Sequence, residues 1–112
     1  MIRKINKIME VIELKRIKKL VEQINDEICG AKNYAETYLE FKAKGNMPWA
    51  NKYKEMANDE LKHAMTVHEY TVQEIEELRK VYTPPVEMLE KWDLEHKKYV
   101  EEVAWVKQML TM

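Results

Sequence analysis

The chain contains few of the residues that sheet, disulfide-rich and membrane-spanning proteins depend on. Two glycines and three prolines in 112 residues leave little material for turns, which argues against a protein built from many short strands. A single cysteine, Cys29, excludes an intramolecular disulfide and any Cys-x-x-Cys metal or redox motif. No uninterrupted apolar run reaches the length of a membrane span, and the start lacks the apolar region of a signal peptide. We therefore expect a cytoplasmic protein with no membrane partner.

A strong net charge is also missing. Nineteen basic and twenty acidic residues leave a formal net charge of -1, so no overall field attracts a polyanion and we expect no nucleic-acid partner. The first twenty residues are locally basic, and a basic amphipathic helix is an alternative contact for anionic lipid or nucleic acid. An exposed, solvated helix face is the commoner explanation of such a run.

What the chain has instead is helical patterning. Apolar residues recur three and four positions apart along most of its length, which predicts amphipathic helices. Gly45-Asn46-Met47-Pro48 and Thr83-Pro84-Pro85 are the two interruptions, and both are typical helix boundaries. The sequence predicts an all-α single domain, residues 1–112, with three long helices over about 2–44, 49–82 and 85–112. Because the connections are short, consecutive helices should be antiparallel, in an up-down-up arrangement.

Three polar residues interrupt the apolar rows. Glu27 is the one charged residue in a row of the first helix that otherwise holds Leu, Ile, Ala, Tyr and Phe. Glu60 and His63 interrupt a row of the second helix together, and residues three apart project from one helix face. A buried carboxylate is costly unless it is paired or bound to a metal. The competing explanation for Glu27 is an edge position paired with a lysine of the next helix.

Helix registry predicts that these three residues meet. Residues equally far from an antiparallel turn lie at one level, with about 1.5 Å of rise per residue. The midpoint between Glu27 and the Glu60/His63 pair falls near residue 44, beside the first turn. On the third helix, Glu102 is only a few residues from that level, so it is the additional candidate ligand within the chain.

The other two histidines are expected to be structural. His96 should be level with about Val72, roughly 13 Å from the level of His63 at the helical rise, so we expect it in the core or at an interface. His68 lies centrally on an apolar face, where a hydrogen-bonded core histidine is the commoner role.

Carboxylates combined with imidazole suit iron, manganese or zinc. Glu27 followed by Glu60-Leu61-Lys62-His63 resembles the first half of a ferritin-like protein such as a bacterioferritin or a rubrerythrin, over roughly the first two helices. The resemblance implies that Glu27, Glu60 and His63 bind iron. It also implies ferroxidase or peroxide-scavenging activity, an oxidoreductase reaction with dioxygen or peroxide as the small substrate.

The chain departs from that family because it has no fourth helix with a second Glu-x-x-His. Asp93-Leu94-Glu95-His96 is the nearest equivalent, and Glu102 stands about where a third-helix glutamate is expected. A twofold dimer would supply four carboxylates and two imidazoles, enough for two irons per dimeric site, with manganese or zinc as alternatives. This arrangement is similar to the encapsulated ferritins. We therefore expect a half-bundle completed by oligomerisation, as a homodimer or larger. The alternative is a metal-free structural or adaptor protein that self-associates or packs on a partner.

Overall fold

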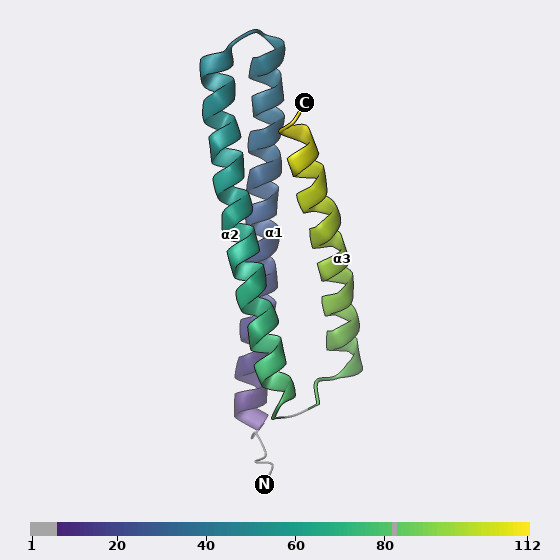
Figure 1. The fold of residues 1–112 in the computed structure, drawn as a ribbon. Coiled ribbons are helices and arrows are strands. Elements are labelled where there is room, and N and C mark those ends of the chain that lie inside the picture. The colour runs from purple at the N-terminus through teal and green to yellow at the C-terminus, as the bar shows by residue number, and fades with distance from the viewer. Residues whose placement is uncertain (1–6, 82) are drawn as a thin grey trace.

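The computed structural model describes residues 7–81 and 83–112, which form three α-helices. In chain order these are α1 (Lys7–Ala43), α2 (Met47–Arg79) and α3 (Val86–Met109) (Figure 1). No strand occurs within the described residues. The predicted all-α, three-helix fold is therefore confirmed, while the predicted helix start at residue 2 and helix end at residue 82 lie outside the described residues.

The first turn follows from its four residues. Gly45 has φ +76°, a left-handed conformation that favours glycine and ends α1. The side chain of Asn46 then accepts a hydrogen bond from the backbone N–H of Trp49, at 3.4 Å, and so caps α2. Pro48 occupies the first turn of α2, where the missing N–H costs nothing. Because Asn46 is the cap, α2 begins at Met47, two residues earlier than predicted.

The second turn is set by proline. Pro85 has ψ 145° and immediately precedes α3, which agrees with the extended conformation expected of a residue that cannot continue a helix. Two helix ends differ from prediction by about three residues. The second helix ends at Arg79 rather than at about residue 82, and the third ends at Met109 rather than at about residue 112.

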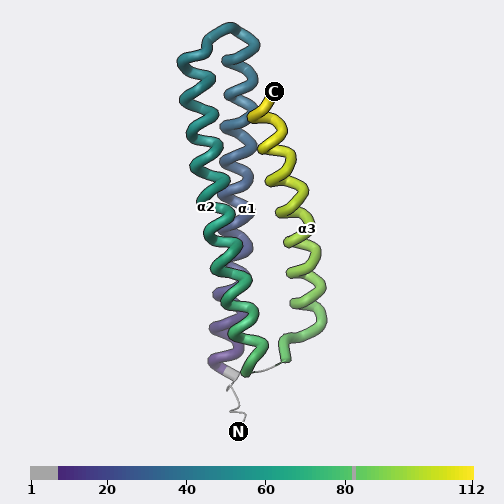
Figure 2. The backbone as a smooth tube through the Cα atoms, in the orientation of Figure 1, coloured from purple at the N-terminus to yellow at the C-terminus, as the bar shows by residue number. Residues whose placement is uncertain are grey.

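The three helices make a rod with principal extents of 64 × 19 × 18 Å. α1 and α2 form a long antiparallel hairpin, and α3 runs back beside it (Figure 2). The carboxyl-terminal end of α3 lies close to α1, whereas its amino-terminal half stands away from the hairpin in Figure 1. Among the described residues, no helix is both long and apolar enough to cross a membrane.

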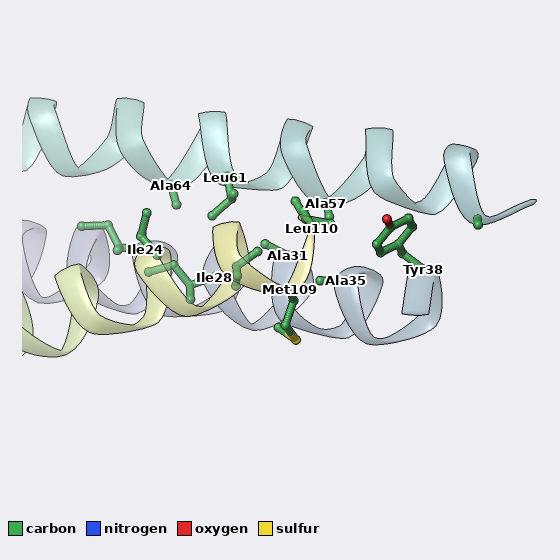
Figure 3. Close-up of a cluster of buried hydrophobic side chains, with 13 residues drawn as sticks. Ile24, Ile28, Ala31, Ala35, Tyr38, Ala57, Leu61, Ala64, Met109 and Leu110 are labelled. Atoms are coloured by element: carbon green, nitrogen blue, oxygen red, sulfur yellow. The ribbon is translucent and has the colours of Figure 1, made fainter. Parts of the chain in front are cut away.

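The core occupies the seam between α1 and α2 and is closed by the end of α3. Figure 3 shows alanine and larger aliphatic side chains facing each other across this seam. The small alanines let the two backbones approach closely, while Ile28 is completely buried. The residues that form this core are Ile24, Ile28, Ala31, Ala35, Tyr38, Ala50, Ala57, Leu61, Ala64, Val103, Val106, Met109 and Leu110. By contrast, no residue between positions 86 and 100 is fully buried, so α3 is anchored mainly by its carboxyl-terminal third.

Candidate metal centre

Glu27 of α1 meets Glu60 and His63 of α2 near the middle of the hairpin. Each offers one ligand atom, and these atoms all lie within 4.8 Å of one another. Nδ1 of His63 is 3.4 Å from Oε2 of Glu27. Across residues 7–81 and 83–112, these three make up the only group of three or more carboxylate, imidazole or thiol side chains that converges in this way. The hairpin registry has therefore brought together the three residues selected from the sequence.

The two carboxyl groups of this cluster influence each other's protonation. The pKa of the Glu60 carboxyl is raised, chiefly because its protonated form donates a hydrogen bond to Glu27. Burial and the negative charge of Glu27 raise that pKa further, while a positive charge on His63 acts in the opposite direction. Two carboxylates held together in this way favour a shared proton or a bound cation, since either one reduces their repulsion.

Gly30 is a member of the site that the sequence reasoning did not assign. A Cβ atom at this position would lie 3.4 Å from Oε2 of Glu60. Gly in a helix interior costs roughly 0.5–1 kcal/mol relative to Ala, and here a Cβ would come into van der Waals contact with the Glu60 carboxylate. The signal was visible as the one glycine inside a 37-residue helix, because an isolated helical glycine often has a packing or functional reason.

The cluster lies on the flank of the hairpin that faces away from α3. Nδ2 of Asn25 donates a hydrogen bond to Oε2 of Glu95 on α3, at 3.2 Å. Glu27 follows Asn25 by two residues, which places it about 200° further around α1. α3 therefore approaches the hairpin from the opposite side. Glu102, which is half-buried on α3, does not join the group formed by the other three predicted ligands.

The exposure of the ligands agrees with this placement. The His63 side chain is 61% exposed and that of Glu27 is 22% exposed. Met65, two residues beyond His63, lines a pocket with Tyr99 of α3, so on α2 as well the third helix covers the side away from the cluster. One face of the candidate centre is open to solvent or to a partner.

The remaining histidines form a separate pair. Nε2 of His68 and Nδ1 of His96 are 2.9 Å apart, so His68 is hydrogen-bonded, in agreement with its predicted role. His96 is not part of the metal-ligand group and lies one helical turn from the level predicted at Val72. The difference arises because the extended Pro84–Pro85 segment shifts the start of α3 along the rod.

Aromatic rings continue along the same flank from the cluster toward the first turn. Tyr34 follows Glu27 by seven residues, or two helical turns, and its ring centroid is 5.9 Å from that of Tyr53. Phe41 stacks on Tyr53 at 5.6 Å and on Trp49 at 6.4 Å. These contacts pack α1 against α2 in the part of the hairpin between the Glu27, Glu60 and His63 cluster and the first turn.

The donor set and spacing suit a transition metal. Two ligands of one metal with bond lengths near 2.1 Å are at most about 4.3 Å apart. Three ligands of one tetrahedral metal lie about 3.4 Å from one another at such bond lengths, so atoms within 4.8 Å of one another would have to move closer by up to about 1.4 Å to bind one ion. Two carboxylates and one imidazole are suited to iron, manganese or zinc.

Comparisons with known proteins found no match to this chain. No protein-family profile, curated protein or solved structure matches the chain. The candidate function of the chain is therefore inferred from the Glu27, Glu60 and His63 cluster of the hairpin.

Proposed function

We propose that this chain is a ferritin-like metal-binding protein, with a di-iron site shared between two subunits and ferroxidase or peroxide-scavenging activity. The observation that carries the proposal is the convergence of Glu27, Glu60 and His63 within 4.8 Å on the flank that α3 leaves uncovered. A set of three ligands on an open flank is suited to completion by a second copy of itself.

The proposed dimer has its twofold axis through the cluster. Two copies of each ligand then supply four carboxylates and two imidazoles, the complement that two irons need in di-iron carboxylate bundles. The surrounding flank also carries apolar surface, since Met56, one turn before Glu60, is 38% exposed and Trp49 is 49% exposed. Burial of such side chains favours association by about 25 cal/mol per Å².

Within this site the residues have different tasks. Glu27 and Glu60 chelate or bridge, and His63 adds a nitrogen ligand. The raised pKa of Glu60 means that metal binding displaces a proton, so metal affinity falls as the solution becomes more acidic. Bound iron would supply one-electron chemistry toward dioxygen or peroxide.

The decisive test is metal content per chain measured together with solution mass. Fe(II) is added to the metal-free protein without oxygen, and air is then admitted. We expect one iron per chain, an increase in near-ultraviolet absorbance on oxidation, and the mass of a dimer, twice the chain mass of 13.5 kDa. The double variant Glu60→Ala/His63→Ala should keep its helix content and lose iron uptake. Wild-type protein that takes up no iron, manganese or zinc contradicts the proposal.

The alternative function is a metal-free structural or adaptor role, and one observation favours it. The 3.4 Å contact between His63 and Glu27, together with the raised pKa of Glu60 beside Glu27, indicates that the three side chains can interact with one another without a metal. Under this alternative, the double alanine variant keeps the wild-type solution mass, and neither protein takes up metal.

A further inference from the structure

A pair of histidines forms the polar link between α2 and α3. His68 on α2 and His96 on α3 approach to 2.9 Å between ring nitrogens. The link is accompanied by aromatic rings of α3: the ring of Tyr99 lies nearly parallel to that of His68 with a centroid separation of 4.0 Å, and the Trp92 ring also stacks with His68 at 5.6 Å. His68 is half-buried by these contacts, while His96 is exposed.

This link holds the part of α3 that has the fewest other attachments. Residues 86–100 include no fully buried side chain, and a groove of about 410 Å³ separates them from α1. The groove has a mostly apolar lining that includes Leu14, Val21 and Met88. The amino-terminal half of α3 is therefore docked beside this groove by the packing of Met88 and Trp92 on a small buried cluster, Ile17, Ile75 and Leu78, and by the hydrogen bond from Asn25 to Glu95.

A hydrogen bond between two imidazoles depends on their protonation. One ring must donate an N–H and the other must offer an unprotonated nitrogen. One added proton can still be shared between the rings, but a second proton leaves two donors and two positive charges facing each other at 2.9 Å. The link therefore exists only while at least one of the two rings is neutral.

The charged groups around the pair do not neutralise a second proton. In the described part of the chain, neither imidazole lies within ion-pair distance of a carboxylate. On α2, Lys62 and Glu69 lie beside Tyr99. The charged groups that α1 and α3 place along the neighbouring groove are Lys18, Glu22, Glu87, Lys91 and Glu95. Glu95 is engaged with Asn25, so it is held toward α1.

We propose that the His68–His96 pair is a pH-sensitive latch, which holds the amino-terminal half of α3 on the hairpin at neutral pH and releases it under mildly acidic conditions. Burial and the neighbouring His96 lower the pKa of His68. The docked state thus binds protons less readily than the undocked state. The stability contributed by the latch is present above the ordinary histidine pKa of about 6.5 and is lost as pH falls through the lower pKa of the docked state.

Hydrogen exchange along α3 provides the test. After correction for intrinsic exchange rates, backbone amides of residues 88–99 should lose protection below about pH 6.5. For one linked proton, the loss is at most about tenfold per pH unit. Amides of the hairpin core, at residues 24–35 and 57–64, should keep their protection, and far-ultraviolet circular dichroism should show that helix content is unchanged. No loss of α3 protection between pH 7.5 and pH 5 overturns the proposal.

Three variants show which group is responsible. His96→Gln and His68→Gln remove the titrating rings while keeping an amide for hydrogen bonding, and each should abolish the acid-induced loss of protection. His63→Gln is the matched control and should leave that loss in place, because it acts only on the candidate metal centre. A loss that persists in both latch variants overturns the proposal.

A titration of the wild-type imidazoles by NMR gives a measurement that needs no variant. The latch requires the two rings to titrate as a coupled pair, with His68 protonating at lower pH than a free histidine. Two independent, unshifted titrations overturn the latch and leave the proposed metal function untouched, whereas failure of metal uptake leaves the latch untouched.

Discussion

Replacing Glu60 by glutamine should stabilise the metal-free protein while removing its ability to bind metal. In the folded chain, Glu60 and Glu27 offer oxygens within 4.8 Å of each other, and glutamine retains the shape of the side chain without its charge. The amide N–H of glutamine can also donate to the Glu27 carboxylate at any pH. The 3.4 Å contact between Glu27 and His63 is left in place.

The size of the effect follows from the distance between the carboxylates. Two unit charges at the 4.8 Å upper limit of this separation repel by about 1 kcal/mol in water and by about 3.5 kcal/mol at an effective dielectric constant of 20. The cluster is open to solvent on one side, since His63 is 61% exposed, so the lower value applies once screening is included. We therefore expect Glu60→Gln to raise the free energy of unfolding by about 1 kcal/mol at pH 7, which corresponds to about 4–8 °C in Tm for a chain of this size.

The pH dependence has a defined sign. Because the folded state raises the pKa of Glu60 above its ordinary value of 4.5, the folded chain binds this proton more tightly than the unfolded chain. The stabilisation is complete below pH 4.5 and is lost as pH rises through the raised pKa. Wild-type protein should therefore lose about 1 kcal/mol across that interval, and Glu60→Gln should not. Urea unfolding of both metal-free proteins between pH 4 and pH 8 measures this difference. A variant that is less stable than wild type at pH 7, or that has the same pH profile, refutes the reasoning.

Three further substitutions test the packing and the turn. Gly30→Ala should stabilise the metal-free chain by about 0.5–1 kcal/mol, since the nearest neighbours of the new Cβ are atoms of the flexible Glu60 side chain. A lower Tm than wild type in thermal unfolding would contradict this prediction. Ile28→Ala should cost about 2–5 kcal/mol of stability, because Ile28 is fully buried. Its control, Val100→Ala on the exposed face of α3, should change stability by less than about 0.5 kcal/mol. Equal losses of stability for the two variants in urea unfolding would disprove the assigned core. Gly45→Ala should cost about 1–2 kcal/mol, because φ at this position is +76°, and an unchanged unfolding midpoint would argue against the left-handed turn.

The fold was predictable because each local signal agreed with the others. Gly45 and Pro48 mark one turn and Pro84–Pro85 the other, while the spacing of apolar residues identifies the faces that pack. The hairpin registry was also accessible, since a three-residue connection between two long helices leaves little freedom in their relative height. That registry is sufficient to bring Glu27 to the level of Glu60 and His63.

The placement of α3 was harder to predict, for a physical reason. Registry gives the height of a residue along the rod but says nothing of which flank of the hairpin a third helix covers. Glu102 is near the right height, yet the Asn25–Glu95 contact shows that α3 packs on the side away from Glu27. The residue level with His96 also differed from the prediction by one helical turn, because Pro85 is extended, with ψ 145°, and so displaces α3 along the rod.

The position of α3 also limits how such a molecule can assemble. A two-helix hairpin with apolar surface on both flanks has two complementary faces, so copies can stack without end into a filament. α3 occupies one of those flanks and leaves Glu27, Glu60 and His63 on the other. In the proposed dimer, each subunit would pair through this flank alone, as an isologous interface requires. The third helix would then limit the assembly to two subunits, and we expect a chain that lacked it to associate further.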